Sequence, residues 1–271
     1  MSKEQSAQSF LDPLVDLAHA AGQAILTIYQ QDRLAVEKKA DDSPVTAADL
    51  ESQRVIVEGL GVLAPEIPVL AEESAAAPWT ERRDWDRFWL VDPLDGTREF
   101  LARNGEFTVN IALIEDGLPT AGVVLAPALD RAWIGARDAG AFEIEGDARR
   151  PIEAKGTGAA EPTIMVSRSH AGEKVERYLG RLGAHQRLPM GSSIKLCLVA
   201  TGEADLYPRL NPTRMWDTAA GHAVLLAAGG DIIIARAEGV DGAGEPLRYY
   251  REELLNPGFV AYGTSGPPAV L

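Results

Sequence analysis

Two carboxylates three positions apart, Asp92 and Asp95, follow an apolar run that predicts a buried strand over residues 88–91. Pro93 lies between them and has no N–H for a sheet ladder, so we expect the strand to stop there. Gly96 then permits a sharp turn that brings the backbone and both carboxylates to one point. Carboxylates and a carbonyl oxygen at a strand end suit a hard divalent cation such as magnesium. The alternative is an ordinary polar turn, in which Asp, Pro and Gly are common.

Three further places in the chain put acids at the predicted end of a helix or strand. Asp49 stands three residues after Thr46, and this spacing predicts a helix capping box that explains the acid structurally. Glu72 and Glu73 follow a predicted strand, where a solvated turn would explain both. Asp217 begins a predicted helix, where an acid favours the helix dipole. Each of these acids therefore has a structural explanation of its own.

If the acids converge in space, they form a site for two or more divalent ions. Its ligands would be Glu72, Asp92, Asp95, Asp217 and the Leu94 carbonyl. Two ions about 3.5–4 Å apart stabilise the attacking and leaving oxygens of a phosphoryl transfer. No Ser-His-Asp order, cysteine nucleophile motif or zinc-like Cys/His spacing competes with this chemistry. We interpret His222 as a packed or partly exposed side chain and Cys197 as a core residue.

The elements that must position these residues begin with a first lobe, residues 1–150, of helices followed by a large, mostly antiparallel sheet. Hydrophobic spacing predicts helices over 10–30, 45–63 and 97–101, the last capped by Asp95 or Thr97. Strands are predicted over 34–39, 67–71, 88–91, 107–114, 119–125, 131–136 and 141–144. Residues 147–161 are rich in Gly, Ala, Pro and charge, and we place the lobe boundary there.

The second lobe, residues 151–271, is predicted to be α/β, because strands alternate with helices. Strands are predicted over 163–167, 185–188, 204–207 and 232–234. Helices are predicted over 172–182, 192–201 and 215–228. The whole chain is therefore expected to combine α+β and α/β architecture.

The composition restricts the partners and the compartment. The 271 residues carry a net charge of −14, which argues against a nucleic-acid partner but permits a small anionic substrate drawn by bound metal ions. A single cysteine excludes an intrachain disulfide and fits a reducing compartment. The polar start and the lack of an apolar run long enough for a bilayer predict a cytoplasmic protein. A peripheral position at the inner membrane stays open, and no oligomeric state is predicted.

Four motifs in the same order give the chain its resemblance to the inositol monophosphatase superfamily. They are Val45–Asp49, Glu72–Ser74, Asp92–Thr97 and Trp216–Gly221. Within the superfamily the chain looks most like the CysQ-type 3'(2'),5'-bisphosphate nucleotidases. The stretches that carry this similarity are Lys38–Thr46, Gly96–Phe100, Arg103–Ile111, Gly191–Lys195, and Asp205–Arg209 running into Trp216–His222. Arg98 stands where Lys is expected, which keeps the charge but changes its geometry.

The resemblance implies a layered αβαβα sandwich and a phosphatase that uses two or three magnesium ions per site. The implied metal ligands are Glu72, Asp92, Asp95, Asp217 and the Leu94 carbonyl. Asp49 and Thr97 are implied to orient and activate the attacking water, which reverses the purely structural explanation of Asp49. Implied substrate contacts are Glu72, Leu94, Asp95, Gly96, Thr97 and Asp217, with the Gly96 and Thr97 N–H groups on the phosphate.

Gly191, Ser192 and Lys195 are candidates for nucleotide contacts, because short polar groups precede a predicted helix there. Lys195 has two open interpretations, a contact to a 5'-phosphate or a solvated lysine on a helix.

The activity that the resemblance implies is hydrolysis of adenosine 3',5'-bisphosphate to AMP and phosphate in sulfur assimilation. A related substrate is 3'-phosphoadenylyl sulfate, and lithium inhibition is a family trait. One alternative is an inositol or sugar monophosphatase of the same superfamily. Another is a non-catalytic regulator that binds magnesium or a nucleotide. A third, a structural protein with solvated acidic turns, predicts no rise in thermal stability on adding magnesium.

Overall fold

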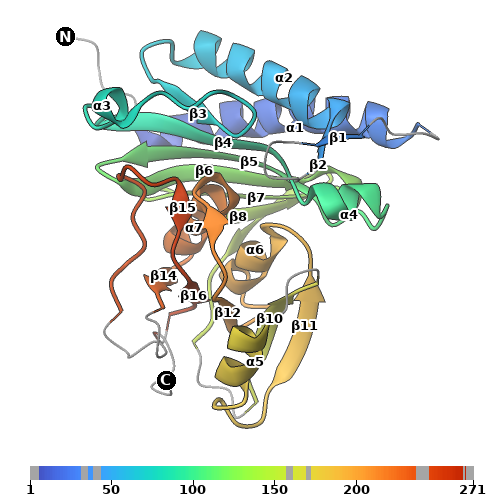
Figure 1. Cartoon of the computed structure of the whole chain (residues 1–271), viewed down its shortest axis with the longest axis vertical. Coiled ribbons are helices and arrows are strands. Elements are labelled where there is room, and N and C mark those ends of the chain that lie inside the picture. The colour runs from blue at the N-terminus through green and yellow to red at the C-terminus, as the bar shows by residue number, and fades with distance from the viewer. Residues whose placement is uncertain are drawn as a thin grey trace.

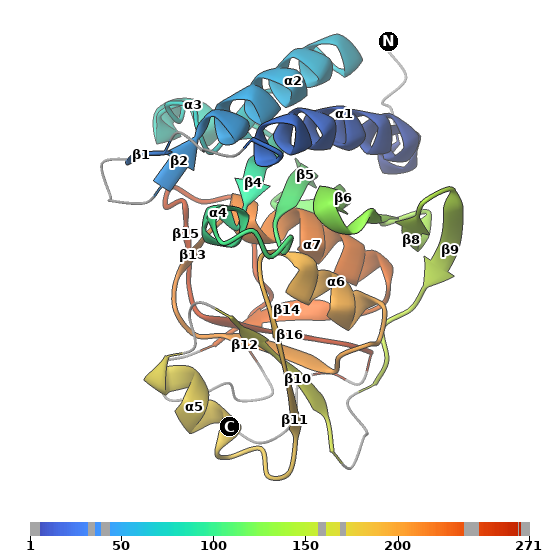
Figure 2. The same ribbon diagram turned by 90° about the vertical axis from the view of Figure 1, so that its right-hand side faces the viewer.

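The computed structural model describes residues 6–31, 36–38, 44–156, 161–168, 172–235, 244–264 and 266. Figure 1 and Figure 2 show layers that alternate between helices and sheet: a large sheet lies between an outer and a middle helical layer, and a smaller sheet with a helix on its far face follows. The expected αβαβα sandwich is therefore confirmed. Among the described residues, we find no helix with the length and apolar character that crossing a membrane requires.

The outer helical layer consists of α1 (Leu11–Tyr29) and α2 (Ala47–Leu63), preceded by a short 3-10 turn, η1 (Ala7–Phe10). The apolar residues of α1 recur at spacings of three and four, so one face is buried against the sheet. Thr46 caps α2, and the capping box with Asp49 is formed as the sequence predicts. The capping box fixes where α2 begins, and therefore where Asp49 lies.

The large sheet has seven strands in chain order, and only its first pair is parallel. The strands are β3 (Val69–Ala71), β4 (Arg87–Asp95), β5 (Thr108–Glu115), β6 (Leu118–Ala126), β7 (Arg131–Ala136), β8 (Gly140–Glu145) and β9 (Ala148–Ile152). Strand β9 overlaps the segment 147–161, where we placed the lobe boundary and predicted no strand. The charged, proline-containing composition of β9 does not favour a strand. The segment is nevertheless a strand, because its backbone pairs with β8.

The middle helical layer consists of α6 (Ile194–Ala200) and α7 (Trp216–Ala227). Helix α7 lies against the large sheet where two glycines, Gly122 on β6 and Gly135 on β7, are paired in register. A Cβ atom at Gly122 would lie 2.8 Å from the Ala220 carbonyl oxygen, and one at Gly135 would lie 2.8 Å from the Cα of Val224. The glycines therefore allow the helix backbone to approach the sheet closely.

The smaller sheet has the strand order β11-β10-β12-β16-β14 and is mixed. Its strands are β10 (Thr163–Ser167), β11 (Gln186–Met190), β12 (Leu206–Arg209), β14 (Asp231–Ile234) and β16 (Phe259–Tyr262). Helix α5 (Glu173–Leu179) covers its outer face (Figure 2). Strands β10, β11 and β12 are parallel, as an α/β arrangement predicts, whereas β16, which we did not predict, pairs antiparallel with β12 and β14.

The remaining elements are short. They are β1 (Val36–Lys38) paired with β2 (Pro44–Thr46), α3 (Trp79–Arg82), α4 (Thr97–Leu101), η2 (Pro127–Leu129), and β13 (Thr213–Arg214) paired with β15 (Leu255–Asn256). The strand expected over 34–39 lies partly outside the described residues. The pairs β1–β2 and β13–β15 lie close in sequence to Asp49 and Asp217, so both pairs bear on the site.

Candidate active site

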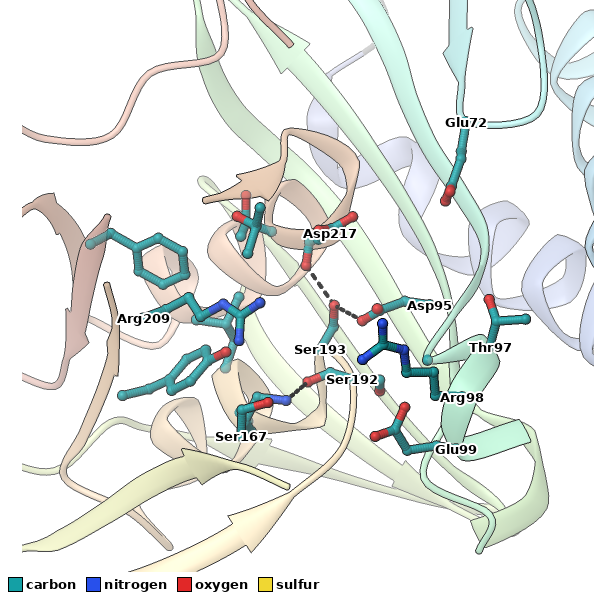
Figure 3. Close-up of a pocket in the computed structure, with 17 residues that line it drawn as sticks. Glu72, Asp95, Thr97, Arg98, Glu99, Ser167, Ser192, Ser193, Arg209 and Asp217 are labelled. Carbon is teal, nitrogen blue, oxygen red and sulfur yellow. Dashed lines mark hydrogen bonds between the residues drawn. The ribbon is translucent and has the colours of Figure 1, made fainter. Parts of the chain in front are cut away.

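A cavity of about 280 Å³ lies where the middle helices meet the end of β4 (Figure 3). Seven of the predicted site residues line it, namely Glu72, Asp95, Gly96, Thr97, Ser192, Lys195 and Asp217. The other four predicted residues, Asp49, Asp92, Leu94 and Gly191, are buried but are not among those that line the cavity. The structure therefore brings acids from β4, α7 and the end of β3 to one side of the molecule.

The end of β4 differs from the expectation. The strand does not stop at Pro93, because pairing with β5 resumes at Asp95 opposite Thr108 after an irregularity that follows Asp92. Two hydrogen bonds hold the bulged segment: the Leu94 N–H donates to Asp92 Oδ1 over 3.1 Å, and Ser52 Oγ on α2 donates to the Pro93 carbonyl over 2.7 Å. Pro93 lies in a bulge, where its lack of an N–H donor costs the sheet no hydrogen bond.

The cap of α4 also differs from the expectation. Gly96 is the N-cap residue, with φ at 92°, and no side chain caps the helix, so the roles predicted for Asp95 and Thr97 as caps are wrong. A Cβ atom at Gly96 would lie 3.1 Å from the Glu106 carbonyl oxygen and 3.2 Å from the Cβ of Ser192. Both the left-handed conformation and this close approach favour glycine.

Asp49 uses its two carboxylate oxygens differently. Oδ2 accepts from the Thr46 N–H over 2.8 Å, which is the contribution of Asp49 to the capping box, and also from Thr46 Oγ1 over 2.7 Å. Oδ1 lies 3.5 Å from Thr97 Oγ1 at the edge of the cavity. The structural explanation of Asp49 is therefore correct, and it leaves one oxygen directed toward Thr97.

Asp217 is fixed by the backbone that precedes it. The Arg214 N–H donates to Asp217 Oδ2 over 2.8 Å, and Arg214 belongs to the β13–β15 pair. In β15, Asn256 donates through Nδ2 to the Arg214 carbonyl over 2.8 Å and to Thr218 Oγ1 over 2.8 Å. The buried amide of Asn256 thereby ties the start of α7 to the segment that orients Asp217.

The acids are crowded in a buried environment. Burial raises the pKa of Asp92, Asp95 and Asp217 above their ordinary values, and neighbouring carboxylates, including Glu72, raise them further. A divalent cation would favour the charged forms of these groups. The donor set is all oxygen, the set that magnesium prefers, so the residues fit the ion. Within the described ranges, however, no three acid, histidine or cysteine side chains are already grouped as a metal site, and Figure 3 shows Glu72 apart from Asp95 and Asp217.

Opposite the acids the cavity is basic and aromatic. Lys195 is 4% exposed, donates through Nζ to the Met190 and Ser192 carbonyls and lies 5.4 Å from the ring centroid of Tyr207. Burial lowers the pKa of Lys195 to about 8, although the Asp95 carboxylate opposes this shift. The interpretation of Lys195 as a solvated lysine is therefore wrong. Arg209 Nε is buried and has no protein partner within the described part of the chain.

Sequence reasoning missed two polar residues of this site, Asn110 and Arg209, and included Ser193 only within the Gly191–Lys195 candidate for nucleotide contacts. Ser193 Oγ lies 2.8 Å from Asp95 Oδ2 and 2.9 Å from Asn110 Nδ2. Asn110, Ser193 and Arg209 all fall inside stretches on which the resemblance rests, so those stretches were the available signal. The buried positions of Cys197 and His222 agree with the core assignments made from sequence.

Comparison with known proteins decides the family. The profile described as "Inositol monophosphatase family" matches residues 6–256. The chain belongs to the inositol monophosphatase family. It is 50% identical over 251 residues to the 3'(2'),5'-bisphosphate nucleotidase CysQ of Shigella flexneri, an alignment that covers 92% of this chain and 98% of the relative.

Solved structures of this inositol monophosphatase family agree. A crystal structure of CysQ from Bacteroides thetaiotaomicron has a TM-score of 0.83 at 38% identity, over 95% of this chain and 98% of the other. The inositol monophosphatase of Anabaena has a TM-score of 0.73 at 26% identity, over 95% and 92% of the two chains.

Proposed function

We propose that this member of the family is a magnesium-dependent 3'(2'),5'-bisphosphate nucleotidase. Its substrate would be adenosine 3',5'-bisphosphate, hydrolysed to AMP and phosphate, with 3'-phosphoadenylyl sulfate as a related substrate. The observation that carries the proposal is that one cavity is lined both by the acids Glu72, Asp95 and Asp217 and by the basic side chains of Lys195 and Arg209. An inositol monophosphate needs no second anion site, whereas a bisphosphate does. The relatives named CysQ support the same choice.

The roles of the chain's residues follow from their positions. Glu72, Asp92, Asp95, Asp217 and the Leu94 carbonyl would hold magnesium, which when bound lowers the pKa of a water and neutralises phosphate oxygens. Thr97 and the Asp49 oxygen facing it would orient the attacking water. The N–H groups of Gly96 and Thr97 would hold the phosphate that is cleaved, because Gly96 lacks the side chain that would cover them.

The second phosphate would contact the basic side of the cavity. Arg209 lines the cavity, and its guanidinium would donate to oxygens of this phosphate. The rings of Tyr207 and Phe259, in edge contact with centroids 5.8 Å apart, offer an apolar surface beside it. Gly191 and Ser192 belong to the same proposal as nucleotide contacts, as do a cytoplasmic location and a role in sulfur assimilation.

A substrate panel tests the proposal. With magnesium present, we expect kcat/KM to be higher for adenosine 3',5'-bisphosphate than for adenosine 3'-phosphate by at least about 10-fold, the equivalent of one charge-assisted hydrogen bond. Activity on inositol 1-phosphate should be lower still. Equal or reversed preference would favour the inositol or sugar monophosphatase. No turnover together with retained magnesium binding would favour the non-catalytic regulator.

A further inference from the structure

The hydroxyl of Ser193 lies where the end of β4, in the large sheet, meets the starts of α6 and α7, in the middle helical layer (Figure 3). Ser193 precedes α6 and is 3% exposed. Its Oγ is 2.8 Å from Asp95 Oδ2 at the end of β4 and 2.7 Å from the Asp217 carbonyl at the start of α7. One buried hydroxyl therefore contacts two predicted magnesium ligands that are 122 positions apart in the chain, at 95 and 217.

A third contact determines how this hydroxyl is used. Asn110 Nδ2 on β5 lies 2.9 Å from Ser193 Oγ, and an amide nitrogen can only donate. Ser193 therefore accepts from Asn110 and has a single proton to donate. That proton lies within reach of both the Asp95 carboxylate and the Asp217 carbonyl, 2.8 Å and 2.7 Å from Oγ, so one three-centre hydrogen bond connects the two residues. The Ser193 hydroxyl therefore orients the Asp95 carboxylate and holds it beside the start of α7.

Asn110 is itself fixed by the sheet. It is 1% exposed and lies opposite Asp92 in the β4–β5 register. The chain of contacts thus runs from Asn110 on β5, opposite Asp92, to Ser193. From Ser193 it continues to Asp95 and to the Asp217 carbonyl. Its direction is set at β5, an interior strand that pairs with β4 on one side and with β6 on the other.

We propose that Ser193, oriented by Asn110, is a positioning residue that fixes Asp95 relative to Asp217 and so sets the affinity of the acidic cluster for magnesium. The proposal rests on the magnesium dependence in the proposed function and is independent of which phosphate ester is the substrate. Ser193 contacts protein groups only in this role, and its hydroxyl is not a ligand.

The test measures magnesium binding in the full chain without substrate, by the magnesium dependence of the melting temperature, beside the magnesium concentration that gives half-maximal activity. Ser193→Cys keeps the volume but weakens the donor, and Ser193→Ala removes it. We expect both variants to need about 10- to 100-fold more magnesium in both assays, the range measured for groups that orient metal ligands. KM for the nucleotide at saturating magnesium should stay near the wild-type value.

Thr120→Val is the matched control, since Thr120 Oγ1 also donates to a carboxylate, that of Glu115, but at the β5–β6 hairpin. It should leave the magnesium requirement unchanged. The double variant Asn110→Ala with Ser193→Ala should lose no more than the worse single variant, because both act through one contact chain. Wild-type magnesium affinity in Ser193→Cys and Ser193→Ala would overturn the inference. If instead the wild-type chain shows no response to magnesium at all, the proposed function itself fails.

Discussion

At the scale of single residues, Asp49 shows how one carboxylate serves structure and chemistry together. One oxygen completes the capping box with Thr46, and the other faces Thr97. The sequence offered these as competing explanations, and the geometry makes them compatible. The side chain of Thr46 contacts the first turn of α2 and Asp49 Oδ2 but not the oxygen that faces Thr97, so mutation can separate the two functions.

For Asp49→Asn we expect turnover to fall by about 10²–10⁴-fold, because the group that orients the water would lose its charge. Thr46→Val should lower the free energy of unfolding by about 1 kcal/mol through loss of the cap. Its turnover at 25 °C should stay within a few-fold of wild type. Steady-state kinetics and urea unfolding of both variants check this, and equal turnover losses in the two would contradict it.

For Asp95→Asn we expect a fall in turnover of at least about 100-fold, since a ligand should matter no less than the groups that orient it. The rise in melting temperature that magnesium gives the wild type should shrink at the same time, because stabilisation follows ligand affinity. Circular dichroism would verify that the fold is kept. Undiminished turnover would rule out the metal role of Asp95.

The acids of the site could be singled out from the sequence, because each of the four motifs that contain them is a continuous stretch of residues. Ser193 was not assigned a role, because its role depends on β4, β5 and α7 meeting at one hydroxyl. Because these elements lie in separate parts of the chain, no sequence pattern predicts that they meet. The positions of Pro93 and Gly96 were predicted as a turn, but the bulge and the cap depend on pairing with β5 that no local pattern contains.

At the scale of elements, the approach of α7 to the large sheet positions Asp217. The glycine pair on β6 and β7 removes the side chains that would hold the helix away. Small residues on α7, among them Ala220 and Ala223, complete the contact. The small-residue character of this helix was visible in the sequence, but its glycine partners on the sheet were not.

Gly122→Ala should therefore lower the free energy of unfolding by about 1–3 kcal/mol, the usual range for overpacking. Activity should fall too, because α7 carries Asp217. The matched control is Gly61→Ala in α2, whose added Cβ would have no neighbour within 4 Å and should stabilise the helix by about 0.5–1 kcal/mol. Chemical unfolding of both variants measures the difference. An unchanged free energy of unfolding in Gly122→Ala would show that the close contact between α7 and the large sheet is not required.

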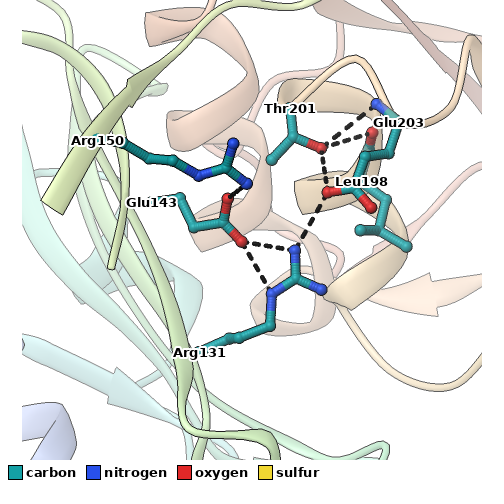
Figure 4. A network of polar contacts seen from close by, with 6 residues as sticks. All are labelled: Arg131, Glu143, Arg150, Leu198, Thr201 and Glu203. Atoms are coloured by element: carbon teal, nitrogen blue, oxygen red, sulfur yellow. Dashed lines mark hydrogen bonds and ion pairs between the residues drawn. The ribbon is translucent and has the colours of Figure 1, made fainter. Parts of the chain in front are cut away.

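Ion pairs around the buried carboxylate of Glu143 connect strands of the large sheet, and one of their arginines also reaches the end of α6 (Figure 4). Glu143 on β8 is fully buried and pairs with Arg131 on β7 and Arg150 on β9, while Arg131 also reaches Glu203 beyond α6, over 3.1 Å. A buried charge of this kind is stable only while its partners are present. The network therefore holds β9 to the sheet although the pattern of β9 does not predict a strand.

At the scale of the whole molecule, the layer order was predictable through the family resemblance, and the detailed pairing was not. The division into residues 1–150 and 151–271 stays a prediction. Helices α6 and α7 come from the second half of the chain and pack on the sheet of the first half. Sequence order alone does not reveal such packing.

The pH dependence of global stability should carry a contribution from His222. Burial lowers its pKa below 6.5, and Arg248 acts in the same direction, while Asp231, 2.9 Å from Nε2, opposes the shift. The unfolded chain therefore takes up this proton more readily than the folded one. Stability from His222 is fully present above pH 6.5 and is lost as pH falls toward the lowered pKa.

Urea unfolding between pH 7.5 and about 5 measures this, with His222→Gln as the comparison. The variant should lose less stability than the wild type as pH falls. Because Tyr249 and Asp231 are unchanged in both proteins, the difference isolates the histidine. Parallel pH profiles would show that His222 does not contribute.

Strand β9 has a consequence for solubility. It forms an edge of the seven-stranded sheet, and edges expose backbone groups that can pair with a second chain. Arg149, Arg150 and Pro151 occupy this edge, where charge and a missing N–H both discourage such pairing. The charged residues and the proline that kept β9 from being predicted as a strand are thus the ones that disfavour pairing of this edge with a second molecule.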